Sequence, residues 1–201
     1  MENKLSFKRL QNLYTKKHFS VSKTSRIFNC SENKINYWLH YYKIPKRTIS
    51  EAIYLKHNPK GDPFKIKNKL NKEEISLKGL GLGLYWGEGD KSKNNTSVRL
   101  SNTDPFLIRK FREFLRKIYK VKEKKISYGL VLFNDVKKSV AIDFWKQHLK
   151  IKREQLGKIT IIPPQGKGRY KRKSKYGVLS LIFTNKKLKE QILDDIRKTY
   201  C

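Results

Sequence analysis

Residues 77–90 constrain the fold of this chain more than any other stretch, because they set five glycines among apolar residues and close on acidic ones. A segment of this kind is either a loop that cradles phosphate or a helix with a glycine face. The loop interpretation fails on spacing, since Gly81 and Gly83 are followed by Gly87, one residue later than the G-x-G-x-x-G dinucleotide loop requires. We therefore expect a helix.

Asn71 and Glu74 give this helix a defined start, because the pattern N-x-x-E is that of a capping box. From there Gly79, Gly83 and Gly87 recur at i, i+4 and i+8 and share one stripe of the helix. A glycine inside a helix costs roughly 1 kcal/mol relative to alanine. We expect the stripe to be a helix-packing interface, where the close approach of a second helix backbone compensates for that cost.

Glu88 ends this helix with a negative charge, at the terminus where the helix dipole disfavours a carboxylate. That placement suggests a bound cation. Residues 81–89 resemble the LAGLIDADG motif of homing endonucleases and related DNA-binding proteins, with Gly83 as the central glycine, Glu88 as the acid and Gly89 as the closing glycine. Trp86 departs from the motif, because the family has a further aspartate there that is not the metal ligand.

The resemblance implies a metal-dependent DNA endonuclease in which two such helices pack side by side. In the family each acid helps to bind a divalent metal at the scissile phosphates, which implies Mg²⁺ held by Glu88 and Gly89. One motif per chain implies a homodimer, because no second glycine-rich stretch with an acid is present. A cationic side chain would assist Glu88 in catalysis by stabilising the phosphorane charge, and the candidates are Arg99, Lys173 and Lys175.

The composition points to a polyanionic partner. The 201 residues carry a formal net charge of +31, spread along the chain, which favours double-stranded DNA or another nucleic acid over a membrane. No apolar run approaches the ~20 residues of a membrane span, and no signal-peptide core follows the N-terminus. Cys30 and Cys201 form neither a disulfide framework nor a zinc pattern. We expect a cytoplasmic, nucleoid-associated protein, although a lysine-rich genome is an alternative source of part of the charge.

Residues 1–45 are predicted to form a helix-turn-helix DNA-binding domain. Residues 20–39 resemble the helix-turn-helix of resolvase-like and sigma-factor-like domains. Ser25 takes the small-residue position of the first helix, and Asn29 takes the turn, where a positive φ is tolerated. Ser31 is suited to cap the second helix.

The exposed side of that second helix is expected to carry Glu32, Asn33, Asn36, Tyr37 and His40. The residues of this helix that we expect to contact DNA are Glu32, Asn33, Lys34, Asn36 and Tyr37. In the major groove an asparagine can read adenine, and a glutamate can accept from cytosine. The cationic side chains of this region suit phosphate oxygens: Lys34, Lys43, Lys46 and Arg47. The alternative is an ordinary helical unit with a solvated polar face.

A connector over residues 46–70, with a Pro- and Gly-containing turn cluster, separates this domain from a LAGLIDADG-like mixed α/β domain over residues 71–201. The whole chain is therefore expected to be α+β, with a sheet of about four strands. Strands are predicted at 96–101, 125–133, 158–162 and 176–184. Helices are predicted at 105–118, 135–150 and 186–200. The second of these has an apolar stripe of Val136, Val140, Phe144 and His148, with Trp145 and Leu149 beside it.

Residues 166–175 form a strongly basic segment between the last two predicted strands. We expect it to clamp phosphates, with Arg169 and Arg172 binding DNA and Lys173 or Lys175 reaching the catalytic site. A solvated loop is the alternative.

Three functions remain open on the sequence. The first is an endonuclease that hydrolyses DNA phosphodiester bonds with Mg²⁺. The second is a transcription regulator on the same fold, which binds DNA without cutting it. The third is a basic protein that associates with RNA or the ribosome, and the glycine-rich motif makes this one the least favoured.

Overall fold

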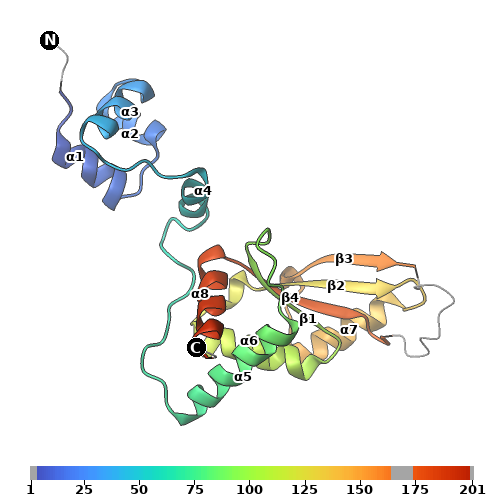
Figure 1. The fold of residues 1–201 in the computed structure, drawn as a ribbon. Coiled ribbons are helices and arrows are strands. Elements are labelled where there is room, and N and C mark those ends of the chain that lie inside the picture. Colours follow the sequence, from blue (N-terminus) through green and yellow to red (C-terminus); the bar gives the residue numbers. More distant parts are fainter. Residues whose placement is uncertain (1–3, 164–173, 200–201) are drawn as a thin grey trace. The chain divides into compact units, whose positions relative to one another are not determined.

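The computed structural model describes residues 4–163 and 174–199. They form eight α-helices and one four-stranded mixed sheet, which confirms the expected α+β class. The chain divides into two compact units, Met1–Asp62, which is helical, and Pro63–Cys201, which holds the sheet (Figure 1). Within the described ranges, none of the helices has the length and apolar character needed to cross a bilayer.

Four α-helices and one π-helical turn make up the first unit. They are α1 (Phe7–Gln11), the π-helical η1 (Asn12–Lys16), α2 (Val21–Phe28), α3 (Glu32–Tyr41) and α4 (Ile49–His57). Ser20, Ser31 and Thr48 each cap a helix by accepting a hydrogen bond from the amide three residues later. A small core holds the unit together: Leu5, Leu10, Tyr14, Ile35, Trp38, Leu39 and Ile44.

The turn between α2 and α3 depends on Asn29. Its φ and ψ angles of 49° and 52° lie in the left-handed region, which asparagine tolerates better than most residues. The amide of Cys30 donates to the carbonyl of Ser25 at 3.0 Å and so closes α2, and Ser31 then begins α3. The local predictions for Asn29 and Ser31 are both confirmed.

Helix α5 (Lys72–Glu88) opens the helical part of the second unit and has the predicted capping box. The Asn71 side chain accepts from the Glu74 amide at 2.9 Å, and the Glu74 carboxylate accepts from the Asn71 amide at 3.2 Å. The Lys67 ammonium also donates to this carboxylate and is the main reason that the pKa of Glu74 lies below its usual value. The other helices are α6 (Pro105–Lys117), α7 (Lys138–Leu149) and α8 (Lys186–Arg197), with 3-10 turns η2 (Glu123–Lys125) and η3 (Arg153–Gln155).

The sheet has the strand order β1-β4-β2-β3, so its last strand in sequence lies inside it. The strands are β1 (Ser97–Asn102), β2 (Ser127–Phe133), β3 (Leu156–Ile162) and β4 (Val178–Thr184). Strand β4 runs antiparallel to both β1 and β2, with Leu181 opposite Leu100 and Tyr128, whereas β3 runs parallel to β2. The sheet therefore combines parallel and antiparallel pairs, and its four strands agree with the expected number.

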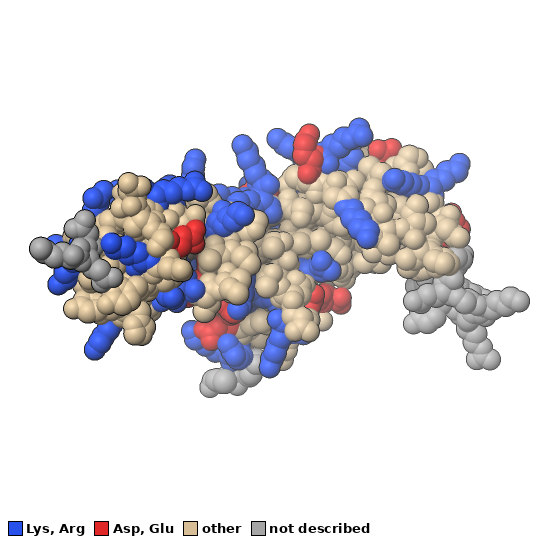
Figure 2. All heavy atoms as spheres, turned by 90° about the horizontal axis from the view of Figure 1, so that it is seen from above, with Lys and Arg blue, Asp and Glu red and all other residues tan. Residues whose placement is uncertain are grey.

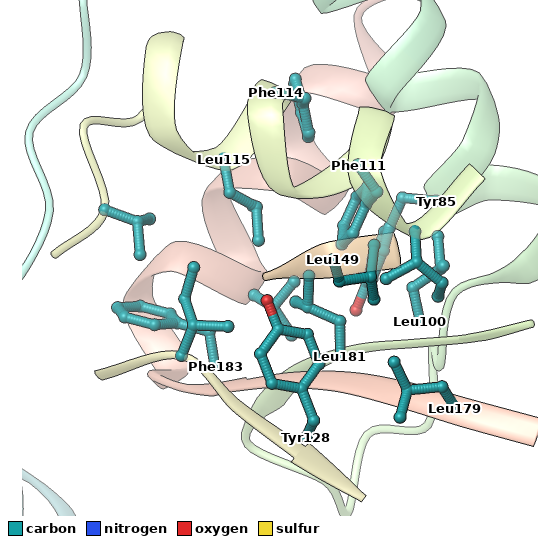
Figure 3. Close-up of a cluster of buried hydrophobic side chains, with 14 of the residues drawn as sticks. Tyr85, Leu100, Phe111, Phe114, Leu115, Tyr128, Leu149, Leu179, Leu181 and Phe183 are labelled. Atoms are coloured by element: carbon teal, nitrogen blue, oxygen red, sulfur yellow. The ribbon is translucent and has the colours of Figure 1, made fainter. Parts of the chain in front are cut away.

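The two faces of the sheet differ in character, because alternate residues point to opposite sides. The inner face packs into the core with α5, α6, α7 and α8, and Figure 3 shows Tyr128, Leu179 and Leu181 facing Phe111 and Leu115 of α6. The opposite, outer face carries smaller and more polar side chains: Ser97, Arg99 and Ser101 of β1; Ser180, Ile182 and Thr184 of β4; and Ser127, Gly129 and Val131 of β2.

The buried face of α7 is turned by one position from the predicted stripe, towards the two residues, Trp145 and Leu149, that were expected beside it. The residues buried are Ala141, Trp145 and Leu149, whereas Val140 is 49% exposed. Both sets recur at i, i+4 and i+8, so periodicity alone did not distinguish them. The indole of Trp145 decides the matter, because its Nε1 donates to the carbonyl of Tyr176 at 2.8 Å from inside the core.

Candidate nucleic-acid interface

Helix α3 presents the predicted DNA-contacting residues on one solvent-facing side. Glu32, Asn33 and Tyr37 are exposed, and Lys34 and Asn36 are half-buried. The opposite side buries Ile35, Trp38 and Leu39 in the core of the first unit. The five predicted residues are thus brought together on a rigid element. Glu32 also has a local structural role, because a carboxylate in the first turn interacts favourably with the helix dipole.

Arg47 does not serve as a free phosphate contact, contrary to expectation. Its guanidinium lies 4.1 Å from the centre of the Tyr14 ring and donates to the carbonyls of Tyr14, His18 and Phe19. These carbonyls lie at and after the end of η1, where helical acceptors lack partners within the helix. Arg47 therefore ties the segment after α3 to the end of η1.

The end of α5 joins the edge of the sheet. Gly89 forms an isolated antiparallel bridge with Leu100, and the amide of Asp90 donates to the carbonyl of Arg99 at 2.9 Å. Glu88 is the last residue of α5 and directly precedes this bridge. The acid of the motif therefore lies next to the edge strand β1, whose Arg99 and Ser101 belong to the outer face. We call Glu88, Gly89, Asp90, Arg99 and Ser101 the carboxylate edge.

The two carboxylates of this edge differ in their surroundings. Asp90 accepts from the amide of Ser92 at 2.9 Å and from the side chain of Asn95. The Asn95 hydrogen bond is the main reason that the pKa of Asp90 lies below its usual value. The Glu88 side chain is exposed, and its carboxylate has no hydrogen bond or ion pair with any described residue. Of the two, Glu88 is the carboxylate available to a ligand.

The loop after Asp90 rests on a buried lysine that sequence reasoning missed. Lys189 of α8 is only 4% exposed, and its Nζ donates to the carbonyls of Ser92 and Asn95 at 2.8 Å each. Burial lowers the pKa of this amine. Because a buried charge needs partners, Lys189 fixes the loop and, through Asn95, the Asp90 carboxylate. Nothing in the local pattern of α8 distinguishes it from the exposed lysines nearby.

The glycines of α5 divide into two sets. A Cβ on Gly79, Gly83 or Gly87 would meet no atom within 4 Å, so the predicted stripe is open to solvent in the single chain. A Cβ on Gly81 would instead overlap the ring of Phe114 in α6. The close helix approach within the chain is therefore made at Gly81, which the stripe did not include.

The open stripe is flanked by apolar side chains. Ile75 is 60% exposed, Leu80 48% and Trp86 55%, all on the side of α5 that carries Gly79, Gly83 and Gly87. So apolar a side is unusual for a helix that faces solvent.

Lys175 is the one member of the predicted basic clamp that the structure describes; Arg169, Arg172 and Lys173 lie outside the described residues. Its Nζ is 5.5 Å from the centre of the Tyr176 ring, which stacks on Phe144 of α7 with centroids 3.8 Å apart. Lys175 is therefore held at the α7 side of the sheet. The structure gives no contact between it and Glu88.

Cationic side chains are distributed over the surface, and Figure 2 shows scattered lysine and arginine side chains on the visible face, with fewer carboxylates among them. No group of three or more metal-binding side chains occurs among the residues described. Mg²⁺ nevertheless binds proteins through only one or two carboxylates, with water and phosphate oxygens as its other ligands. The exposed Glu88 carboxylate, followed by the backbone oxygen of Gly89, fits one half of such a site.

Comparison with protein-family models gives no match to the chain, and searches of curated proteins and of solved structures likewise give none.

Proposed function

We propose that this protein binds double-stranded DNA sequence-specifically and, as a homodimer of LAGLIDADG type, hydrolyses phosphodiester bonds with Mg²⁺ at Glu88. In this proposal α3 reads the target, and the outer face of the sheet lies along the duplex. Such a protein would act in the cytoplasm at the nucleoid. The observation that carries the proposal is the exposed Glu88 carboxylate, which lies without a described partner next to the edge strand β1.

Charge supports DNA as the ligand. An unpartnered carboxylate on a chain with a net charge of +31 would ordinarily attract a neighbouring lysine or arginine. Glu88 has acquired none among the described residues, while Arg99 lies on the adjacent strand with its side chain exposed. An acid without an ion pair, beside a face that offers cations, suits a site for a metal ion and a phosphate together.

Each residue of the site would have a distinct task. Glu88 and the Gly89 carbonyl would hold Mg²⁺, which when bound activates water and stabilises the leaving oxygen of the phosphodiester. Arg99 would balance phosphate charge at the carboxylate edge, and Lys173 or Lys175 would do so from the basic segment. Asp90 would keep the end of α5 in register with β1 through its amide hydrogen bond to Arg99.

A second copy of the chain would complete the site. One carboxylate per chain supplies half of the protein ligands that a metal between two DNA strands would need. The open stripe of Gly79, Gly83 and Gly87 offers a surface on which a second α5 can approach closely. Packing two such helices would bring two Glu88 carboxylates together and cover Ile75, Leu80 and Trp86.

A transcription regulator that does not cut DNA is the second candidate. It is favoured by the helical first unit, whose capped helix α3 presents Glu32, Asn33 and Tyr37 to solvent. The regulator would use the same α3, the same outer face and the same dimer, so DNA binding does not separate it from the nuclease.

The decisive experiment measures binding and cutting on the same DNA. The full chain is incubated with a random duplex library at low salt, in Mg²⁺ or in EDTA, and both retained and nicked sequences are determined. We expect Glu88→Gln to bind the same sites and to lose nicking. Glu73→Gln is the matched control, because it removes an exposed carboxylate from the other end of the same helix.

Each outcome has a definite meaning. Nicking by the wild type that Glu88→Gln abolishes supports the nuclease. Binding without nicking by the wild type overturns the nuclease and leaves the regulator. A chain that does not retain duplex DNA at low salt, or that prefers RNA, overturns both.

A further inference from the structure

Two exposed tyrosines form an ordered aromatic surface on α3. Tyr37 is 55% exposed and Tyr41 56%, and they lie one helical turn apart. Their rings stack with centroids 6.2 Å apart and an interplanar angle of 21°. Each ring also packs edge-on against Trp38, at 5.4 Å for Tyr37 and 5.1 Å for Tyr41. Because Trp38 is buried, the pair is held in place by the core of the first unit.

The two rings are already ordered before any ligand binds. Tyrosine has few rotatable bonds, so it loses little conformational entropy when it contacts a ligand. The stacked arrangement also leaves more than half of each side chain outside the protein, at a cost in unburied apolar surface. The pair therefore provides a flat, largely apolar surface that is already ordered.

Two asparagines lie beside this surface on the same side of α3. Asn33 is exposed and Asn36 half-buried, and neither side chain forms a hydrogen bond with any described residue. A carboxamide offers both a donor and an acceptor, the combination that the major-groove edge of adenine requires. Asn33 precedes Tyr37 by one helical turn, so carboxamide and aromatic groups are presented together.

Helix α3 offers few residues that read a G·C pair. The commonest specific contact to guanine is a bidentate arginine or lysine. Helix α3 contains no arginine, and its single lysine, Lys34, is half-buried at the margin of the exposed side. Glu32 is the one exposed side chain of α3 that can accept from cytosine, and it lies at the first position of the helix. The tyrosines and asparagines that follow it suit A·T pairs, within a unit whose thirteen lysines and arginines against four carboxylates suit a duplex backbone.

We propose that α3 selects an A·T-rich major groove, in which Tyr37 and Tyr41 pack on thymine 5-methyl groups and Asn33 and Asn36 pair with adenine. The thymine methyl is the one apolar group that the base pairs present in the major groove. This inference rests on the proposed DNA-binding function and adds the base composition that the protein selects.

The test uses the full, unaltered chain in EDTA at low salt. Selection from a random duplex library should enrich sites containing an A·T-rich half-site. The selected site is then synthesised with deoxyuridine in place of thymidine in that half-site, which removes only the methyl groups. We expect affinity to fall about fourfold for each contacted methyl, the equivalent of one buried CH₂ group.

A variant identifies the protein side of the contact. The double variant Tyr37→Ala, Tyr41→Ala should bind the thymidine and deoxyuridine sites equally, because the surface that senses the methyl group is gone. Phe106→Ala is the matched control, since it removes a 60% exposed aromatic side chain of α6. Phe106→Ala should keep the preference of the unaltered chain for the thymidine site over the deoxyuridine site.

Failure of the inference differs from failure of the proposed function. Selection of G·C-rich sites, or equal binding of thymidine and deoxyuridine sites by the unaltered chain, overturns the inference while DNA binding stands. A preference for single-stranded over duplex probes overturns it as well, because the tyrosines would then be stacking on unpaired bases. A chain that binds no duplex overturns the proposed function itself.

Discussion

A Cβ atom at Gly81 would overlap the ring of Phe114, so α5 passes α6 at a point where only a hydrogen atom fits. The contact lies beside the stacked rings of Tyr85 and Phe111, whose centroids are 5.7 Å apart. Helix α5, which ends in Glu88, is thus held against the core by close packing of Gly81 on the Phe114 ring, in addition to hydrogen bonds.

Gly81→Ala should destabilise the protein by about 1–3 kcal/mol, the usual effect of overpacking a close-packed core. Gly83→Ala is the matched variant on the same helix, and nothing lies within 4 Å of its new methyl group. It should stabilise the chain by about 1 kcal/mol through higher helix propensity. Denaturant unfolding, at a concentration where the chain is monomeric, measures the change in the free energy of unfolding for each variant. Equal changes in the two variants would contradict the packing described for Gly81.

Gly83→Leu tests the proposed dimer. The leucine side chain would hold a second α5 away from the stripe, so the mass found by sedimentation should fall from dimer to monomer. Ser139 is an exposed small residue on α7 and serves as the control. Ser139→Leu should leave the mass unchanged. A dimer that persists in Gly83→Leu would show that the chains associate elsewhere.

Asn29→Ala tests the turn that connects α2 to α3. Alanine in the left-handed region costs roughly 1–2 kcal/mol, whereas Asn29→Gly removes the steric conflict and should cost less. Thermal unfolding of both variants provides the measurement. Asn33→Ala, an exposed site within the helix, serves as the control and should change stability by no more than about 0.5 kcal/mol.

Stability should decline in alkali because of buried tyrosines. Burial, followed by the charge of Asp90, raises the pKa of Tyr85 to about 12, while an unfolded tyrosine titrates near 10. Above pH ~10 the unfolded chain therefore releases a proton that the folded chain retains, and the free energy of unfolding falls as the pH rises towards 12. Burial also raises the pKa of Tyr119 and Tyr128.

The measurement is denaturant unfolding from pH 8 to pH 11.5. Tyr85→Phe should be less stable than wild type at pH 8, because the Tyr85 hydroxyl donates to the carbonyl of Asp90 at 2.9 Å. Its stability should nevertheless decline less steeply above pH 10. Parallel curves for the two proteins would mean that Tyr85 does not contribute to the alkaline loss.

Local features were the ones that sequence could predict. The capping box of Asn71 and Glu74, the left-handed Asn29 and the cap at Ser31 each depend on residues within a few positions of one another. The strand predicted at 96–101 is also local, because alternation along it is enough to put Val98 and Leu100 on one side and Arg99 on the other, as the structure has them.

Features that depend on residues far apart in the chain were missed. Helical periodicity defined the faces of α5 but not which of them meets α6, so Gly81 was not distinguished from Gly83. Charge suggested that Arg47 contacts phosphate, and nothing in the sequence pattern pointed to Lys189, yet backbone carbonyls from other segments hold both of them. The basis of recognition by Tyr37 and Tyr41 also required coordinates, because stacking is not a property of sequence spacing.

The position of β4 in the sheet affects how the chain can fold during synthesis. Strands β1 and β2 do not pair with each other but are joined through β4, which is the last of the four strands to be made. Until Val178–Thr184 has left the ribosome, the apolar sides of β1 and β2 have no strand between them, and the sheet cannot close. The nascent chain thus carries uncompleted strand edges from the synthesis of β1 until that of β4, whereas every residue of the helical first unit is made before β1 and that unit can fold early.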